Sequence, residues 1–203
     1  MRSRNAALNK DRRDGILAAA GRCFVRDGFD ATSMKSICRE AGMSPGTVYH
    51  YFASKAEIVV GIIERESSMA AELIATVDKN AHVIAGLFSV IDRIEADLTD
   101  DELVLHAEIG AVLLRDPQLR EQARLAEEDM IARLAARLDH AKAAGLIDDR
   151  LDALTMAILI GALIDGLIWR ASLHGRPAFL ASLPSVKQAI GRMLTGSDLN
   201  GIA

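Results

Sequence analysis

Residues 32–55 have the sequence TSMKSICREAGMSPGTVYHYFASK, a pattern typical of two short helices joined by a tight turn. The first helix can begin at Thr32 or Ser33, because a hydroxyl there can accept a hydrogen bond from an otherwise unpaired backbone N–H group. It should end at Gly42, since a residue without a Cβ adopts the left-handed backbone of a helix end at little cost. The sequence therefore predicts a sharp corner between two crossing helices.

The second helix is predicted to run from Pro45 to Tyr51. Ser44 is a favoured N-cap residue, and Pro45 suits the first helical position because its φ angle is preset and it has no N–H group to leave unpaired. At about 100° per residue, Val48 and Phe52 share one side of this helix. The other side carries small and hydrogen-bonding residues, namely Gly46, Thr47, Tyr49 and His50. We therefore expect one side to pack and the other to contact phosphates and base edges.

Lys55 follows this helix by one turn. Its ammonium group can neutralise a phosphate, aided by the N–H groups of a further helix that begins near Ser54. An ordinary helical hairpin with a polar outer face is the alternative interpretation of the segment. DNA binding is favoured because four features occur together in one short window: the turn glycine Gly42, Pro45 at the start of the second helix, the aromatic cluster that follows it, and Lys55.

The segment resembles the N-terminal helix-turn-helix of the TetR family of transcriptional regulators, and the match covers about the first 60 residues. It is carried by four features of the sequence: an opening helix with Ile16, Leu17, Ala20 and Phe24, the Gly28-Phe29 break, Ile37-x-x-x-Ala41-Gly42, and Gly46-Thr47-Val48-Tyr49-x-x-Phe52-x-Ser54-Lys55. The resemblance implies an all-helical homodimer that binds a palindromic operator, with its short recognition helix in the major groove and a small-molecule pocket in its C-terminal domain.

The resemblance also implies candidate DNA contacts, residue by residue. These are Lys35, Thr47, Tyr49, His50, Tyr51 and Lys55, with Thr32 or Ser33 at a phosphate. The residues that shape the start of the recognition helix complete the candidate set, namely Ser44, Pro45 and Gly46. His50 occupies a variable position of the family pattern, so the base it would read does not follow from the resemblance.

Charge is distributed unevenly along the chain. The formal net charge of the 203 residues is -4, which by itself argues against a nucleic-acid partner. Residues 1–60, however, contain 10 Lys and Arg against 6 Asp and Glu, a net charge of +4, whereas residues 61–203 contain 14 against 22, a net charge of -8. The sequence predicts a basic DNA-binding domain at residues 1–54, fused without a linker to an acidic helical domain at residues 55–203.

The first thirteen residues lack the apolar run of a signal peptide and carry five cations, Arg2, Arg4, Lys10, Arg12 and Arg13. They are predicted to form a basic arm, which either adds phosphate or minor-groove contacts or is a solvated tail. Cys23 and Cys38 fall on the apolar sides of helices. Without a secretory segment, they are expected to be reduced core thiols of a cytoplasmic protein.

The rest of the chain is predicted to be helical, which makes the fold class all-α. Broad apolar stripes and local helix breaks at Asp100-Asp101, Asp116-Pro117, Gly145 and 174–177 place the further helices near 56–77, 81–98, 101–115, 117–144, 149–173 and 177–195. The first of these follows directly from the DNA-binding segment, so a tilt of this helix would move the recognition helix.

The stretch Ala153 to Trp169 is apolar nearly all round. Asp165 interrupts it and leaves the uninterrupted run short of the ~20 residues that a bilayer requires, so burial in protein is expected instead of a membrane span. Its small residues would allow close approach of a helix from a second subunit, and residues 180–194 could complete a four-helix interface. A purely intramolecular core explains the same periodicity, so the homodimer prediction rests mainly on the resemblance.

The sequence gives few indications of a ligand pocket. Four C-terminal residues have the chemistry to contact a small molecule, namely Phe88, His106, Asp165 and Trp169. Each has a structural alternative as a core residue, a hydrogen-bonded helix residue or an ion-pair partner. Residues 103–119 and 162–169 resemble the C-terminal domain of the choline-responsive repressors of betaine synthesis, without specifying the ligand.

An enzyme is not expected, because the sequence contains no H-E-x-x-H pair, Cys cluster, phosphate-binding loop or nucleophile–base pair. No metal or cofactor is therefore predicted. A helical adaptor would explain the acidic C-terminal part, but it would not explain Gly46, Tyr49 and Lys55 together in a basic domain. The sequence thus predicts a dimeric, ligand-responsive transcriptional repressor.

Overall fold

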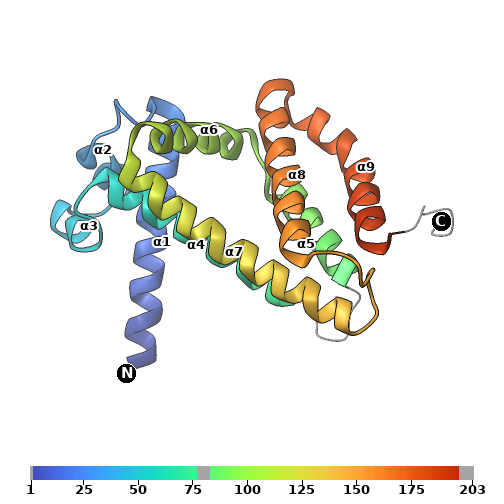
Figure 1. The fold of residues 1–203 in the computed structure, drawn as a ribbon. Helices are drawn as coiled ribbons and strands as arrows, with labels where there is room; N and C mark the ends of the chain where they lie inside the picture. Colours follow the sequence, from blue (N-terminus) through green and yellow to red (C-terminus); the bar gives the residue numbers. More distant parts are fainter. Residues whose placement is uncertain (1, 77–82, 197–203) are drawn as a thin grey trace. The chain divides into compact units, whose positions relative to one another are not determined.

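The computed structural model describes residues 2–76 and 83–196, and the regular structure within these ranges is entirely helical (Figure 1). Its helices are α1 (Arg2–Asp27), α2 (Met34–Ala41), α3 (Pro45–Tyr51), α4 (Lys55–Thr76), α5 (Val83–Asp97), α6 (Asp100–Arg115), α7 (Pro117–Ala143), α8 (Ala153–His174) and α9 (Arg176–Thr195). The all-α prediction is confirmed. The predicted helix end at 77 and helix start at 81 lie outside the described residues.

The corner between α2 and α3 is built from the local interactions that the sequence predicts. Ser33 caps α2 by accepting a hydrogen bond from the N–H of Ser36 at 3.1 Å. Gly42 ends the helix in the left-handed region, with φ 65° and ψ 26°. Ser44 then caps α3 by accepting a bond from the N–H of Thr47 at 3.2 Å. Each cap satisfies backbone groups that a helix end leaves unpaired, so residue types close in sequence fix this corner.

The N-terminal basic segment differs from the prediction. Helix α1 begins at Arg2, so residues 2–13 form the first turns of a helix and not a separate arm. The segment contains no Gly or Pro before Gly15 and includes Ala6, Ala7 and Leu8, which are strong helix formers. The basic residues of this segment therefore continue the DNA-binding part of the chain as one helix.

The chain divides into two compact units. The first contains the residues up to Arg65 together with Val104–Arg124, and the second contains Glu66–Leu103 and the residues from Leu125 onwards. The first turns of α4, most of α6 and the start of α7 belong to the same unit as the helix-turn-helix. The domain boundary after residue 54 stays a prediction.

The first unit has its own hydrophobic core. Helices α1 to α4, with the residue that follows α3, contribute Ile16, Leu17, Phe24, Ile37, Val48, Phe52, Ile58 and Ile62, and α6 and α7 add Leu105, Ile109, Val112 and Leu119. The two cysteines, Cys23 and Cys38, are buried in the same core as free thiols, which confirms their predicted core positions. Because α3 has only seven residues, it depends on this packing for its helical structure.

The second unit is built around the antiparallel helices α8 and α9, which run side by side in Figure 1, with α5 packed against α9. Leu138, Ala157, Ile160, Ile190 and Leu194 are among its fully buried residues. The guanidinium of Arg176 donates hydrogen bonds to the carbonyl oxygens of Leu98 at 2.8 Å and Glu95 at 3.0 Å. It thereby pairs carbonyl groups at the end of α5 that have no partner within the helix.

Candidate nucleic-acid interface

Helix α3 divides into a packed side and an exposed side. Val48 is fully buried and Phe52 is 3% exposed, whereas 53% of Tyr49 is exposed. His50 and Gly46 are exposed beside it. The two buried residues hold α3 in the core of the first unit, so the hydrogen-bonding groups on the other side are presented to solvent on a fixed support.

Most of the predicted DNA contacts lie at the surface. Seven are exposed, namely Ser33, Lys35, Ser44, Pro45, Gly46, Tyr49 and His50. Three are half-buried, namely Thr47, Tyr51 and Lys55. The hydroxyl groups of Ser44 and Thr47 lie 2.9 Å apart and share a hydrogen bond, so the cap of α3 is itself part of the exposed polar surface. The structure thus brings α2, the corner and α3 together as one candidate surface.

Thr32 differs from its neighbour Ser33. It is 2% exposed, and its hydroxyl donates to the carbonyl oxygens of Gly28 at 2.8 Å and Cys23 at 3.2 Å. A threonine hydroxyl has a single proton to donate, and here it is used inside the protein. Of the two residues predicted at a phosphate, Ser33 is therefore the one that the structure leaves accessible.

Lys55 has internal partners that the sequence pattern does not reveal. Its ammonium group donates to the carbonyl oxygen of Phe29 and, at 3.3 Å, to that of Asp30. It also lies 4.4 Å from the centroid of the Phe29 ring, a favourable cation–π geometry. An ammonium has three protons, so a phosphate contact would use the remaining one. Lys55 thus fastens the start of α4 to the turn between α1 and α2.

Two residues of α6 also contact the turn between α1 and α2. The backbone N–H of Phe29 donates to the carboxylate of Glu108 at 2.9 Å, across 79 residues of sequence. The carboxylate of Asp30 lies 3.7 Å from the guanidinium of Arg115. Both backbone polar groups of Phe29 are therefore bound: the N–H by Glu108 and the carbonyl oxygen by Lys55. Glu108 could not be found from the sequence, because a lone acid on a helix gives no indication of a partner so distant in sequence.

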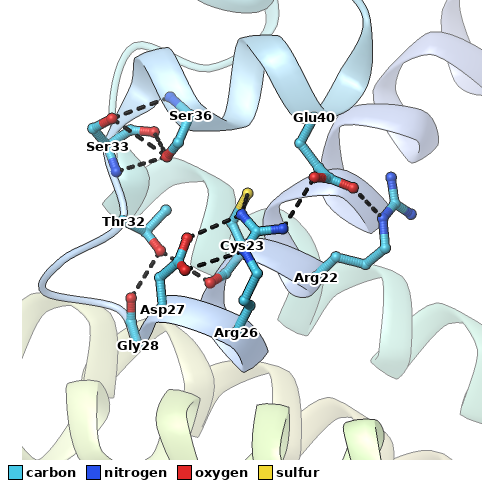
Figure 2. A network of polar contacts seen from close by, with 9 residues as sticks. All are labelled: Arg22, Cys23, Arg26, Asp27, Gly28, Thr32, Ser33, Ser36 and Glu40. Carbon is cyan, nitrogen blue, oxygen red and sulfur yellow. Dashed lines mark hydrogen bonds and ion pairs between the residues drawn. The ribbon is translucent and has the colours of Figure 1, made fainter.

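Charged side chains also join α1 to α2, as Figure 2 shows. Glu40 accepts hydrogen bonds from Arg22 at 2.7 Å and from Arg26 at 3.2 Å (Figure 2). The bond from Arg22, followed by that from Arg26, lowers the pKa of the Glu40 carboxyl. Arg26 also binds Asp27 and lies 3.5 Å from the sulfur of Cys23. Both arginine side chains are about half exposed to water, so each bond contributes only modestly to stability.

Tyr51 connects the end of α3 to α1. Its hydroxyl donates to Oδ1 of Asn9 at 3.0 Å. Its ring meets the ring of His50 edge to face, with centroids 5.2 Å apart and an interplanar angle of 79°. Tyr51 and His50 are among the predicted DNA contacts. Asn9 is not, because it lies 42 residues from Tyr51 and belongs to no recognisable motif.

The four predicted ligand contacts are divided between the two units. Phe88 packs against the core of the second unit, with the ammonium of Lys187 5.9 Å from its ring centroid. Asp165 and Trp169 lie one turn apart on the exposed side of α8. His106 is exposed on α6, in the part of that helix that belongs to the first unit. The grouping of these four residues stays a prediction.

Helix α8 carries a long exposed stripe that is apolar except for Asp165. The exposed fractions are 52% for Leu154, 51% for Ile158, 62% for Trp169 and 63% for Leu173. These residues recur at helical spacing, so they share one face. By length and composition, α8 is the single helix within residues 2–76 and 83–196 that could cross a membrane. The expected burial in protein is met within one copy of the chain for the face that carries Ala157, Ile160, Leu167 and Ala171, but not for this stripe.

Two family models match the chain. One, described as bacterial regulatory proteins of the tetR family, matches residues 16–62, and the other, the C-terminal domain of BetI-type transcriptional repressors, matches residues 90–194. The chain is 25% identical over 185 residues to the HTH-type transcriptional regulator UidR of Escherichia coli strain K12, covering 91% of the chain and 94% of that protein.

Two further relatives agree with these matches. The HTH-type transcriptional repressor Rv1474c of Mycobacterium tuberculosis is 25% identical over 173 residues, which are 85% of this chain and 88% of that protein. The solved structure of Salmonella enterica GusR is 30% identical, with a TM-score of 0.74, and covers 89% of this chain and 95% of its own. The similarity to these proteins therefore extends over both compact units.

Proposed function

The chain belongs to the TetR family of transcriptional regulators and has a BetI-type C-terminal domain, and from this we propose that it is an effector-responsive repressor acting as a homodimer on a palindromic operator in the cytoplasm. Regulators of this family bind DNA and are not enzymes. The observation that carries the proposal is the exposed side of α3, held rigidly by Val48 and Phe52.

The exposed groups of this surface divide by chemistry. Thr47 offers a hydroxyl and Tyr49 and His50 offer ring-borne hydrogen bonds, which can distinguish base edges in a major groove. Lys35 and Ser33 lie on or beside α2 and are suited to phosphates, which fix the register of a protein on DNA without reading sequence. Gly46 lets the backbone approach the duplex closely.

The exposed stripe of α8 supports the homodimer. A row of large apolar side chains that includes Trp169 is costly to leave in water and marks a protein contact in most soluble domains. A second copy presenting the same stripe would bury both, as expected for a two-fold interface. The two α3 helices would then enter major grooves one turn, ~34–36 Å, apart.

The effector is proposed to bind among the helices of the C-terminal part of the chain, and Phe88, His106, Asp165 and Trp169 are each a separate candidate to contact it. Helix α4 begins at Lys55, four residues after α3 ends, so a change in its tilt would move the recognition helix. Coupling between two sites is reciprocal. The operator is therefore expected to weaken effector binding by the same factor as the effector weakens operator binding. Repression agrees with the relative Rv1474c, which is named a repressor.

The proposal is tested by selecting duplexes from a random DNA pool with the purified protein at two salt concentrations. Enrichment of a palindrome, with affinity that falls steeply as salt rises, is the expected result. Tyr49→Ala removes an exposed side chain of α3 and is expected to abolish the enrichment while leaving the fold intact. If the wild-type protein binds no duplex even at low salt, a helical adaptor becomes the better description of the chain.

A further inference from the structure

We propose that Asn9 is a positioning residue for operator sequence readout, acting through Tyr51 on His50. The inference rests on the proposed function, since it concerns how the exposed side of α3 reads DNA. It assigns a role in specificity to a residue of α1 that lies outside the helix-turn-helix motif.

The first step is that the hydroxyl proton of Tyr51 is already used in a hydrogen bond within the protein. The phenolic O–H donates to Oδ1 of Asn9 at 3.0 Å. A phosphate oxygen only accepts hydrogen bonds, and a tyrosine has one proton to give. While the bond to Asn9 exists, Tyr51 cannot donate to a phosphate or to an acceptor on a base edge. Its contribution to recognition is therefore indirect.

The second step is the anchoring of the Tyr51 ring. The ring is half-buried against the core of the first unit, and its hydroxyl end is held by Asn9. A side chain fixed at both ends keeps a single orientation. Because Tyr51 is the last residue of the seven-residue α3, this anchor also holds the end of the helix, where backbone hydrogen bonds are fewest.

The third step is the contact between Tyr51 and His50. The two rings meet edge to face at 79°, with centroids 5.2 Å apart, which is a preferred geometry for aromatic pairs. His50 is otherwise exposed, so this contact restricts the directions in which its ring nitrogens can point. Sequence readout requires hydrogen-bonding groups held in defined directions toward base edges. Losing Asn9 would free Tyr51 and, with it, His50.

A purely structural bond predicts a different result. If the bond between Asn9 and Tyr51 only stabilised the fold, its loss would lower the affinity for all sequences equally. A positioning role predicts a loss of preference confined to the base pairs that His50 reads. The two roles are therefore separable by sequence preference.

The experiment is selection from a random DNA pool by wild-type protein and by His50→Ala, Asn9→Ala and Tyr51→Phe variants. His50→Ala first identifies the base pairs that depend on His50. Asn9→Ala and Tyr51→Phe, which retains the ring, are both expected to lower the preference at those same base pairs by about three- to tenfold. Preference at other positions and affinity for unrelated duplex should stay at the wild-type level.

Lys10→Ala is the matched control, because Lys10 is the exposed neighbour of Asn9 on α1. It should weaken binding to all sequences without changing base preference. The inference is overturned if Asn9→Ala and Tyr51→Phe keep the wild-type preference, if they weaken all sequences equally, or if His50→Ala alters no base preference. Failure of the wild-type protein to enrich any sequence would instead overturn the proposed function, and the inference with it.

Discussion

Replacing Glu108 with Ala is expected to destabilise the turn between α1 and α2. The carboxylate accepts the N–H of Phe29 at 2.9 Å in a partly buried position, and the carbonyl of the same residue is bound by Lys55. Removal of Glu108 leaves this N–H without its acceptor. Hydrogen bonds to charged groups contribute about 1.5–3 kcal/mol. Partial exposure to water reduces that value, so we expect a loss of about 1–2 kcal/mol.

Two variants separate the contribution of charge from that of the acceptor. Glu108→Gln keeps an acceptor oxygen without the charge. It should lower the free energy of unfolding by about half as much as Glu108→Ala, because charge-assisted hydrogen bonds are roughly twice as strong as neutral ones. Glu127→Ala removes an exposed acid of α7 and should change stability by less than about 0.5 kcal/mol.

Thermal unfolding and hydrogen exchange measure the two consequences of the Glu108 change. For a chain of about 200 residues, the expected loss lowers Tm by about 2–8 °C. Exchange of the Phe29 amide should accelerate, because local opening no longer breaks a hydrogen bond. Wild-type Tm together with wild-type protection of this amide in Glu108→Ala would refute the reasoning.

Four further predictions follow from the geometry. A Cβ added to Gly61 would lie 2.9 Å from the side chains of Leu17 and Phe52, whereas one added to Gly110 meets nothing within 4 Å. Urea unfolding should therefore show a loss of about 1–3 kcal/mol in the free energy of unfolding for Gly61→Ala and no loss for Gly110→Ala. Lys55→Ala should weaken binding to every duplex and lower the slope of log affinity against log salt by about one. An unchanged slope would mean that Lys55 contacts its internal partners and no phosphate. The lowered pKa of Glu40 means that its contribution to stability is present above the unfolded pKa of about 4.3 and is lost as pH falls toward the folded pKa. The free energy of unfolding in urea, measured between pH 6 and 3, should therefore fall less steeply with acid in Glu40→Gln than in the wild-type protein. Identical pH profiles of the two proteins would contradict this. Trp169→Glu should yield monomers in sedimentation equilibrium, and persistence of dimers would place the interface elsewhere.

The elements of the helix-turn-helix could be predicted from the sequence because their causes are local. Gly42, Ser44 and Pro45 set a helix end and a helix start within four residues. The packed and exposed sides of α3 follow from helical periodicity in the same way. Segments whose structure depends on neighbours a few residues away are therefore readable without tertiary information.

The supports of the candidate site could not be predicted, because they join residues far apart in sequence. Asn9 meets Tyr51 across 42 residues and Glu108 meets Phe29 across 79. A single polar residue on a helix surface has no periodicity that reveals its partner. The choice between Thr32 and Ser33 likewise depended on burial, because both are chemically suited to a phosphate.

The separation of packing and exposure within α3 has a consequence for the divergence of specificity. Val48 and Phe52 hold the helix in the core, so substitutions at exposed positions such as Tyr49 can accumulate at little cost in folding. A regulator with this arrangement can acquire a new operator through a few changes on one helix. Because Asn9 supports that helix from α1, grafting α3 alone onto a relative would transfer the reading residues without the group that orients them.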